Sequence, residues 1–332
     1  MQKGYPESHS LRLASADDLV EFVQIRNAVW SGHRVSESEL RRDLEQLPPE
    51  NIPTRWLLRS DDGTLGFAEC CRDVGSYHPK KWTIAIGVYA EARGIGIGGR
   101  LYQTVLEFLS PYMPEKIYTQ VAEPDTAALE FALRRGFSEV KRDFESDLDL
   151  TTLDRSALRA MVKENVQVRS AKELDNEPFR RAWHALFETV RVDTPRTDPP
   201  TPLSFDTFNC LVLEDPEFLW EGSQIAFDGN EMIGFSGLYA SDRAGEIIQW
   251  LTGVRREYRG RGVARSMKAH AALWAIENGY QLIKTDNDTR NAPMLTINDR
   301  MGFKRKLGII TMLKTLDPSA PEQICPERMG SA

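Results

Sequence analysis

Two short glycine-rich segments contain the residue types best suited to binding an anion. The first is 93–99, with the sequence RGIGIGG, and the second is 259–264, with the sequence RGRGVA. Glycine lets a loop turn so that several backbone N–H groups face one point. A helix that begins there adds unpaired N–H groups and the positive end of its dipole. Each segment is therefore a candidate phosphate-binding loop.

A strand and a helix must hold such a loop in place. Residues 82–88 precede the first loop as an apolar, β-like run, and 101–109 follow it as a helix-like run. The second loop has the same setting, between 247–254 and 265–278. The chain therefore repeats the order of strand, glycine loop and helix.

Matching residues show how far this repeat extends. Arg93 and Arg259 are 259 − 93 = 166 residues apart. Gly136 and Gly302, each followed by Phe, have the same separation, 302 − 136 = 166. A chance similarity of two loops would not preserve the downstream distance, so we infer a duplicated domain.

The length and composition agree with two globular domains. The chain has 332 residues, which corresponds to two domains of ordinary size. Hydrophobic residues make up 41% and charged residues 27%, the profile of a folded globular protein. We expect an N-terminal domain at 1–150, a linker helix at 151–165 and a C-terminal domain at 166–332.

Charge and cysteine usage exclude several kinds of protein. The net charge of −7 argues against general binding to nucleic acid or to anionic membranes. No run approaches the length of a membrane span, and the N-terminus lacks a signal-peptide core. The four cysteines, Cys70, Cys71, Cys210 and Cys325, form no C-x-x-C pair, which is typical of free thiols in a reducing compartment. We expect a cytoplasmic protein with no metal site and no nucleic-acid or membrane partner.

Two other glycine motifs fit the loops less well. Gly94, Gly96 and Gly99 satisfy the dinucleotide fingerprint G-x-G-x-x-G, but several elements precede this loop, and the second copy has Arg265 in place of the third glycine. A dinucleotide oxidoreductase is therefore disfavoured. A P-loop is also disfavoured, since neither copy ends in G-K-S or G-K-T. What the two copies share is Arg-x-x-Gly-x-Gly/Ala between a strand and a helix.

This shared pattern resembles the acetyl-CoA signature of the GNAT superfamily of N-acetyltransferases, in tandem form. The signature is Gln/Arg-x-x-Gly-x-Gly/Ala, and the order of elements agrees over nearly the whole chain. The resemblance implies an α/β fold of the α+β type, with two fused GNAT domains, each a mixed, mostly antiparallel sheet flanked by helices. It also implies acetyl-CoA as co-substrate.

The resemblance assigns CoA contacts to both halves. In the family, backbone amides of the loop hold the CoA pyrophosphate, and the preceding strand contacts the pantetheine. The corresponding residues here are Val88, Arg93, Gly94, Gly96, Gly98 and Gly99 in the first half, and Val254, Arg259, Gly260, Arg261, Gly262, Ala264 and Asn291 in the second.

A second family pattern, N-x-x-A-x-x-x-Y-x-x-x-G-F, is only partly present. The second half keeps Asn291 but has Asn298 at the tyrosine position, and the first half has Asp125 and Ala132 at these two positions. In the family, that tyrosine often protonates the CoA thiolate. A tyrosine acid is thus in doubt in both halves, although water could supply the proton because a thiolate is a tolerable leaving group. Asn298 remains a candidate catalytic residue by its position.

The implied reaction is attack of an amine on the acetyl thioester, which requires a base. Glu246 opens the strand before the second loop and is the candidate, whereas 82–88 contains no carboxylate. The proline-rich segment 193–202 is a further feature of the second half, either one wall of an acceptor pocket or a plain linker. We therefore expect the second half to be the catalytic one.

The expected function is transfer of the acetyl group of acetyl-CoA to a primary amine of a small molecule or peptide, by a monomer or homodimer. The alternative is a non-catalytic acyl-CoA-binding or sensing protein, which the missing tyrosine of both halves suggests. The sequence does not identify the acceptor amine.

Overall fold

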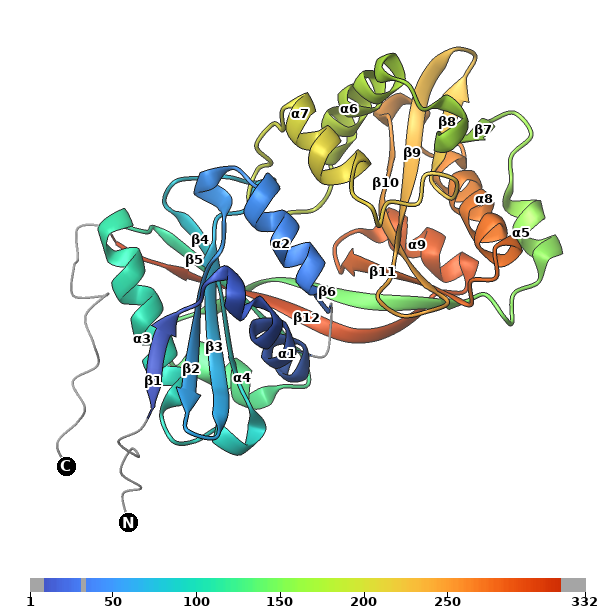
Figure 1. The fold of residues 1–332 in the computed structure, drawn as a ribbon. Helices are drawn as coiled ribbons and strands as arrows, with labels where there is room; N and C mark the ends of the chain where they lie inside the picture. Colours follow the sequence, from blue (N-terminus) through green and yellow to red (C-terminus); the bar gives the residue numbers. More distant parts are fainter. Residues whose placement is uncertain (1–8, 31–33, 318–332) are drawn as a thin grey trace. The chain divides into compact units, whose positions relative to one another are not determined.

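A computed structural model of the chain describes residues 9–30 and 34–317 and divides into two compact units (Figure 1). Unit 1 comprises Met1–Val140 and Ile310–Ala332, and unit 2 comprises Lys141–Ile309. The extreme N-terminus and Cys325 lie outside the described residues. Within the described ranges, none of the helices combines the length and the apolar character needed to cross a membrane.

Unit 1 is a sheet with helices on both faces, in the strand order β1-β2-β3-β4-β5-β12. Side chains alternate between the faces along a strand, so Leu57 packs with α1 and α2, whereas its neighbour Trp56 packs with α3 and α4. The strands are β1 (Ser10–Leu13), β2 (Thr54–Ser60), β3 (Gly63–Cys71), β4 (Lys81–Val88), β5 (Lys116–Ala122) and β12 (Lys304–Thr315). The helices are α1 (Leu19–Val29), α2 (Glu37–Gln46), α3 (Ile97–Leu109) and α4 (Thr126–Leu133).

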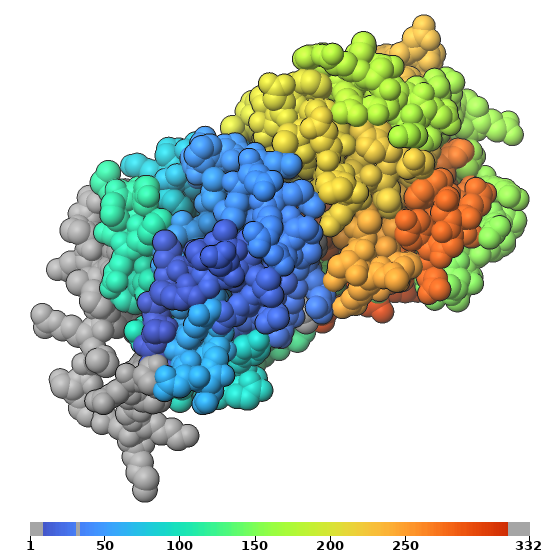
Figure 2. All heavy atoms as spheres, in the orientation of Figure 1, coloured from blue at the N-terminus to red at the C-terminus, as the bar shows by residue number. Residues whose placement is uncertain are grey.

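Unit 2 repeats this plan in the strand order β6-β11-β10-β9-β8-β7. Ile225 packs with α6 and α7, which lie at the surface of this unit (Figure 2), and its neighbour Ala226 packs with α8. The strands are β6 (Ser138–Asp149), β7 (Gln167–Ser170), β8 (Gln224–Asp228), β9 (Glu231–Ala240), β10 (Glu246–Val254) and β11 (Leu282–Asp288). The helices are α5 (Arg155–Met161), α6 (Glu177–Arg191), α7 (Phe205–Phe208), α8 (Val263–Glu277) and α9 (Ala292–Met301).

Both sheets are mixed and mostly antiparallel. The parallel pairs are β4 with β5 and β10 with β11, and the other pairs with a described register are antiparallel. A parallel pair needs a crossover connection, and α3 and α8 provide it in the two units. The predicted architecture of sheets flanked by helices is confirmed.

The compact units do not coincide with the halves of the sequence repeat, because the unit boundaries fall inside β6 and β12. The end of the chain contributes Ile310, Met312 and Leu316 to the core of unit 1. Leu148 and Leu150, from the first half of the sequence, belong to the core of unit 2. The predicted boundaries at 150 and 166 describe the repeat and stay a prediction. Within the predicted linker, the helix is limited to α5.

Candidate functional site

Both glycine loops turn through two residues in the left-handed region. The φ angles are 81° at Gly94 and 89° at Gly96, and 74° at Gly260 and 86° at Gly262. An L-residue with a side chain rarely adopts this conformation, and glycine adopts it freely. The two glycines of each loop are therefore required by the left-handed backbone conformation at their positions. The second of them lies directly before the helix in both loops.

The turns leave backbone amides at the start of α3 and α8 without helical partners. The first helical hydrogen bonds are Arg100 N to Gly96 O at 3.0 Å and Ser266 N to Gly262 O at 2.9 Å. In the described part of the chain, no backbone carbonyl accepts from the amides of 97–99 or of 263–265. Such amides, at the positive end of a helix dipole, are donors for a phosphate oxygen. Both units therefore have amides suited to an anion, and the anion sites stay a prediction.

The two signature arginines brace the loops. Arg93 donates from Nε to the carbonyl of Val88 at 3.2 Å, and Arg259 donates in the same way to the carbonyl of Val254 at 3.0 Å. Each arginine thus fastens the loop to the last residue of the preceding strand. These bonds from the arginine side chains hold the loop against the strand and use none of its backbone amides, which remain available to a ligand.

The guanidinium groups of these arginines are also engaged by carboxylates. Arg93 pairs with Asp125 at 3.4 Å, and Arg259 pairs with Asp193 at 2.7 Å. Asp193 also accepts from Nε of Arg256 at 2.7 Å. The hydrogen bonds from Arg256, together with those from Arg259, hold the pKa of the Asp193 carboxyl well below its usual range. Asp193 is the first residue of the proline-rich segment 193–202, which is a loop as expected, so this loop is fastened to the second glycine loop.

A lysine from the predicted linker lies beside the second glycine loop. A Cβ atom placed on Gly262 would lie 3.3 Å from Cε and 3.3 Å from Cγ of Lys163. The backbone N–H of Lys163 donates to Oγ of Ser266 at 3.2 Å, which fixes this segment against the start of α8. Lys163 adds a cation next to the candidate phosphate site. The sequence contained no signal for it, because a lysine in a charged segment is usually solvated.

Other predicted contact residues differ between the two loops. A Cβ atom on Gly98 would lie 3.1 Å from Phe131 of α4, so a larger residue there would require Phe131 to shift. Its counterpart, Ala264, packs against the apolar cluster around Val263 and Met267. A Cβ atom placed on Gly99 would lie 3.5 Å from Nη2 of Arg135. The guanidinium carbon of Arg261 lies 5.0 Å from the centre of the Tyr258 ring, on which it stacks.

Each unit also has a wedge between its two parallel strands. β4 and β5 pair only from Lys81–Lys116 to Thr83–Tyr118, and β10 and β11 pair only from Glu246–Leu282 to Ile248–Lys284. β4 continues to Val88 and β10 to Val254 without this partner. Unpaired strand edges can accept an extended polar chain. A ligand whose phosphate binds the loop can therefore extend along this edge, as pantetheine would.

The wedges differ in one backbone feature. Pairing of β10 with β9 shifts between Gln249, opposite Leu238, and Thr252, opposite Ser236, so that Trp250 and Leu251 both face Gly237. This is a β-bulge, which leaves one residue unpaired and bends the strand. Pairing of β4 with β3 shows no shift from Thr83 to Val88. Of these two strands, only the one in the second unit has a bulge where it borders its wedge.

Glu246 lies at the end of β10 that is farthest from the glycine loop. It precedes Val254 by 254 − 246 = 8 residues, or about 26 Å along an extended strand. Its carboxylate pairs with Nζ of Lys284 on β11 at 3.1 Å, and its side chain is 19% exposed. A chain that extends from the loop along β10 therefore runs toward Glu246. Its role as a base stays a prediction.

Asn291 and Asp125 have the same role in the two units. Asn291 accepts from the N–H of Met294 at 3.4 Å and caps α9, and Asp125 accepts from the N–H of Ala128 at 2.9 Å and caps α4. Asn298 is buried in α9 and donates to Oδ1 of Asn287 at 3.2 Å. Because Asn291 and Asp125 cap their helices in the same way, Asn291 gives no reason to regard the second half as the catalytic one. Asn298 does have a polar neighbour, Asn287.

Comparison with known proteins agrees with this geometry. The Acetyltransferase (GNAT) family matches the chain twice, at residues 20–137 and 180–303. The chain belongs to the GNAT family. The two matches contain the two glycine loops, so the tandem form inferred from the repeat is confirmed. A comparison with curated proteins found no match.

Solved structures of low sequence identity share this fold over most of the chain. A GCN5-related N-acetyltransferase from Sphaerobacter thermophilus has a TM-score of 0.71 at 19% identity, over 94% of this chain and 97% of that one. A tandem GNAT protein from the clavulanic acid biosynthesis pathway has a TM-score of 0.72 at 16% identity, over 92% and 98%. The N-myristoyltransferase of Saccharomyces cerevisiae with bound myristoyl-CoA has a TM-score of 0.59 at 8% identity, over 95% and 81%. At these identities the likeness shows the fold, which in the GNAT family generally serves acyl transfer from acyl-CoA.

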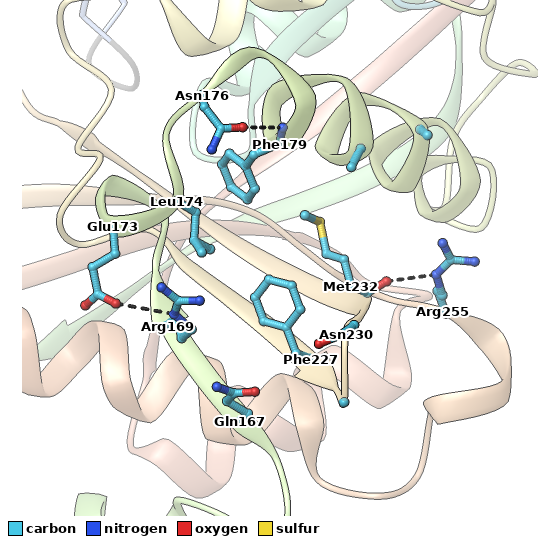
Figure 3. Close-up of a pocket in the computed structure, with 13 residues that line it drawn as sticks. Gln167, Arg169, Glu173, Leu174, Asn176, Phe179, Phe227, Asn230, Met232 and Arg255 are labelled. Carbon is cyan, nitrogen blue, oxygen red and sulfur yellow. Dashed lines mark hydrogen bonds and ion pairs between the residues drawn. The ribbon is translucent and has the colours of Figure 1, made fainter.

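This GNAT chain also has a cavity that contains none of the predicted site residues (Figure 3). Its volume is about 590 Å³, and it lies between α6 and the β7–β9 part of the sheet. Figure 3 shows Phe179 of α6 facing Phe227 and Met232, with the ion pair of Arg169 and Glu173 beside them. Apolar and polar side chains both line the cavity, which lies on the α6 face of unit 2.

Proposed function

We propose that this protein is an N-acetyltransferase that transfers the acetyl group of acetyl-CoA to a primary amine of a small molecule or peptide. The observation that carries the proposal is the pair of left-handed glycine loops, each opening into a helix N-terminus beside an unpaired strand edge. The loop amides would bind the pyrophosphate, and the strand edge would bind the pantetheine. The test is the release of free CoA thiol from acetyl-CoA with a panel of primary amines.

We further propose that the second half is the catalytic one. Its wedge contains the bulge at Trp250 and Leu251, and a backbone N–H freed by a bulge can stabilise an oxyanion. Glu246 stands at the end of β10 toward which the acyl chain would extend. The proline-rich loop is fixed to the glycine loop through Asp193, and we propose that its remaining residues form a wall of an acceptor site. None of these features has a counterpart among the described residues of the first half.

Glu246→Gln is expected to lower kcat/KM by about 10²-fold, because the glutamine keeps the shape and removes the base. Acetyl-CoA binding, measured by calorimetry, should be unchanged. The matched control is Lys284→Met, which removes the ion pair with Lys284 but leaves the carboxylate and its longer contact with Arg243 at 4.0 Å. An equal loss of activity in both variants would show that the ion pair matters and that Glu246 is not the base.

A non-catalytic acyl-CoA-binding or sensing protein is the second candidate. The absence of the family's tyrosine at Ala132 and Asn298 favours it. A sensor would bind acetyl-CoA without releasing thiol faster than the uncatalysed reaction with any amine of the panel. Turnover with one amine would exclude this candidate.

Both halves are expected to bind acetyl-CoA, since both loops have the same backbone geometry and the same arginine brace. Calorimetry should give a stoichiometry of two per chain. Gly96→Glu should reduce it to one and leave the thiol release by the second half intact. A stoichiometry of one in the unmodified protein, unaffected by Gly96→Glu, would show that the first loop does not bind CoA.

A further inference from the structure

The cavity on the α6 face of unit 2 has a charged side chain beside apolar ones (Figure 3). Phe227 of β8 lies opposite Gln167 of β7 and opposite Met232 of β9 in the register of the strands. Residues paired across neighbouring strands share a face of the sheet, so these three form one row of the cavity wall. Arg169 lies two residues from Gln167 along β7, and its side chain therefore faces the same cavity.

Arg169 is an incompletely neutralised cation. Its Nε lies 3.4 Å from a carboxylate oxygen of Glu173, and the two side chains are 40% and 59% exposed, so this ion pair is weak. Within the described ranges, no group of the chain accepts a hydrogen bond from either Nη atom of Arg169. The other arginine of the lining, Arg255, donates to the carbonyl of Met232 at 3.0 Å and lies 3.7 Å from Glu231. Arg169 is therefore the cation best placed to bind an anion in the cavity.

The first half has an arginine at the matching place. Arg12 of β1 lies opposite Leu57 of β2, just as Arg169 lies opposite Ile225. The register of each hairpin shifts after the next residue, so Leu57 and Ile225 correspond, with an offset of 225 − 57 = 168. Arg12 donates from Nη1 to Asp18 at 2.7 Å and from Nη2 to the other oxygen of the same carboxylate. Asp18 is 7% exposed, so the first half gives this arginine a buried carboxylate partner.

The helices that cover the two sheets align through their aromatic contacts. The ring centre of Phe22 in α1 lies 5.1 Å from that of Phe67, and the ring centre of Trp183 in α6 lies 5.8 Å from that of Phe235. Phe67 and Phe235 have the hairpin offset of 235 − 67 = 168. The helices therefore align with an offset of 183 − 22 = 161. This offset relates two carboxylates of the first half to residues of the second: Asp18 to Phe179 (18 + 161) and Glu21 to Ala182 (21 + 161).

The partners of Arg12 belong to an ion network whose counterparts in the second half are apolar. Arg59 donates to Asp18 at 3.3 Å and to Glu21 at 2.9 Å, and the offset of 168 relates Arg59 to Phe227. The counterparts of these three charged residues all line the cavity: Phe179, Ala182 and Phe227. Arg169 thus keeps the position of Arg12 in a setting that has lost the buried carboxylate.

We propose that the cavity binds a small monocarboxylate with an apolar body, whose carboxylate takes on Arg169 the place that Asp18 takes on Arg12. A guanidinium with two free Nη groups matches the geometry of a carboxylate. The apolar body would pack on the rings of Phe179 and Phe227 and on the thioether of Met232.

The size and place of the cavity agree with such a site. Its volume of about 590 Å³ lies in the range of small-molecule sites, about 300–1,000 Å³. It contains none of the residues proposed for acetyl transfer, and it lies on the sheet face opposite the one on which α8 packs. The proposed ligand site is therefore additional to the acetyl-CoA sites and does not depend on the proposed function.

The test uses phenylacetate as the probe and calorimetry as the measurement. Phenylacetate should bind, whereas phenylacetamide, which lacks the charge, and acetate, which lacks the apolar body, should each bind at least about 10-fold more weakly. Arg169→Gln should lower the affinity for phenylacetate about 10-fold or more, to that of the amide. Arg12→Gln, the matched substitution in the first half, should leave the affinity for phenylacetate unchanged.

A second pair of variants changes the cavity through an exposed position, so that folding is preserved. Ala182→Glu introduces the carboxylate that the first half has at Glu21, and Ala182→Gln has the same size without the charge. Phenylacetate should bind about 10-fold or more weakly to the first variant than to the second, because like charges repel. Both variants should unfold at the temperature of the wild type.

Two outcomes would overturn the proposal. One is a wild type that does not bind phenylacetate, or that binds it as tightly after Arg169→Gln. The other is loss of phenylacetate binding in Gly262→Glu, which would place the ligand at the glycine loop. Release of CoA thiol is measured separately, so the proposed function can stand when the ligand site fails, and the ligand site can stand when no amine is acetylated.

Discussion

Gly262→Glu is expected to abolish acetyl-CoA binding by the second half and with it nearly all thiol release. Gly262 has a φ of 86°, and a side chain there would be strained and would press on Lys163 at 3.3 Å. The new carboxylate would also repel the pyrophosphate and pair with the ammonium of Lys163. Calorimetry should show the stoichiometry fall from two to one.

The control for this variant is Gly279→Glu, which has a φ of 80° and open space around the Cβ position. It imposes a similar backbone strain at the other end of α8, and it should leave both the stoichiometry and the thiol release unchanged. Unchanged stoichiometry and affinity in Gly262→Glu would contradict the assignment of this loop. Loss of activity in Gly96→Glu with normal activity in Gly262→Glu would reverse the assignment of the two halves.

A fragment of residues 1–150, the predicted first domain, is expected not to fold stably by itself. It lacks Ile310, Met312 and Leu316, which are at most 4% exposed in the core of unit 1. Loss of one large core side chain typically costs about 2–5 kcal/mol, so three such losses rival the whole stability of a domain, about 5–15 kcal/mol. The fragment should show no cooperative thermal unfolding by circular dichroism.

The matched control is a chain in which residues 1–140 are joined by a flexible linker to 304–317. This chain restores the missing strand and the hydrogen bond from Leu316 N to Glu115 O at 2.9 Å. Cooperative unfolding should return in this version. Cooperative unfolding of the 1–150 fragment alone would show that β12 is dispensable to unit 1.

The glycine loops, the repeat and the family were decided by the sequence alone, because each depends on local chemistry. Left-handed turns at Gly94, Gly96, Gly260 and Gly262 require glycine, so the requirement is visible as a residue type. The caps of α4 and α9 depend on side chains of Asp125 and Asn291 that bond to amides three residues on. Signals of this kind act over a few residues and leave a pattern in the chain.

Only the tertiary structure decided the features that join distant segments. Asp193 meets Arg259 across 66 residues and Lys163 meets Ser266 across 103, and neither pairing follows from a local pattern. The bulge in β10 depends on its register with β9, and the burial of Lys268 depends on the packing of α8 near Phe303. The same holds for β12, because no local pattern indicates that its end joins the core of unit 1. These contacts depend on how distant segments pack together. No local pattern in the sequence indicates them, because they form only when the whole domain has folded.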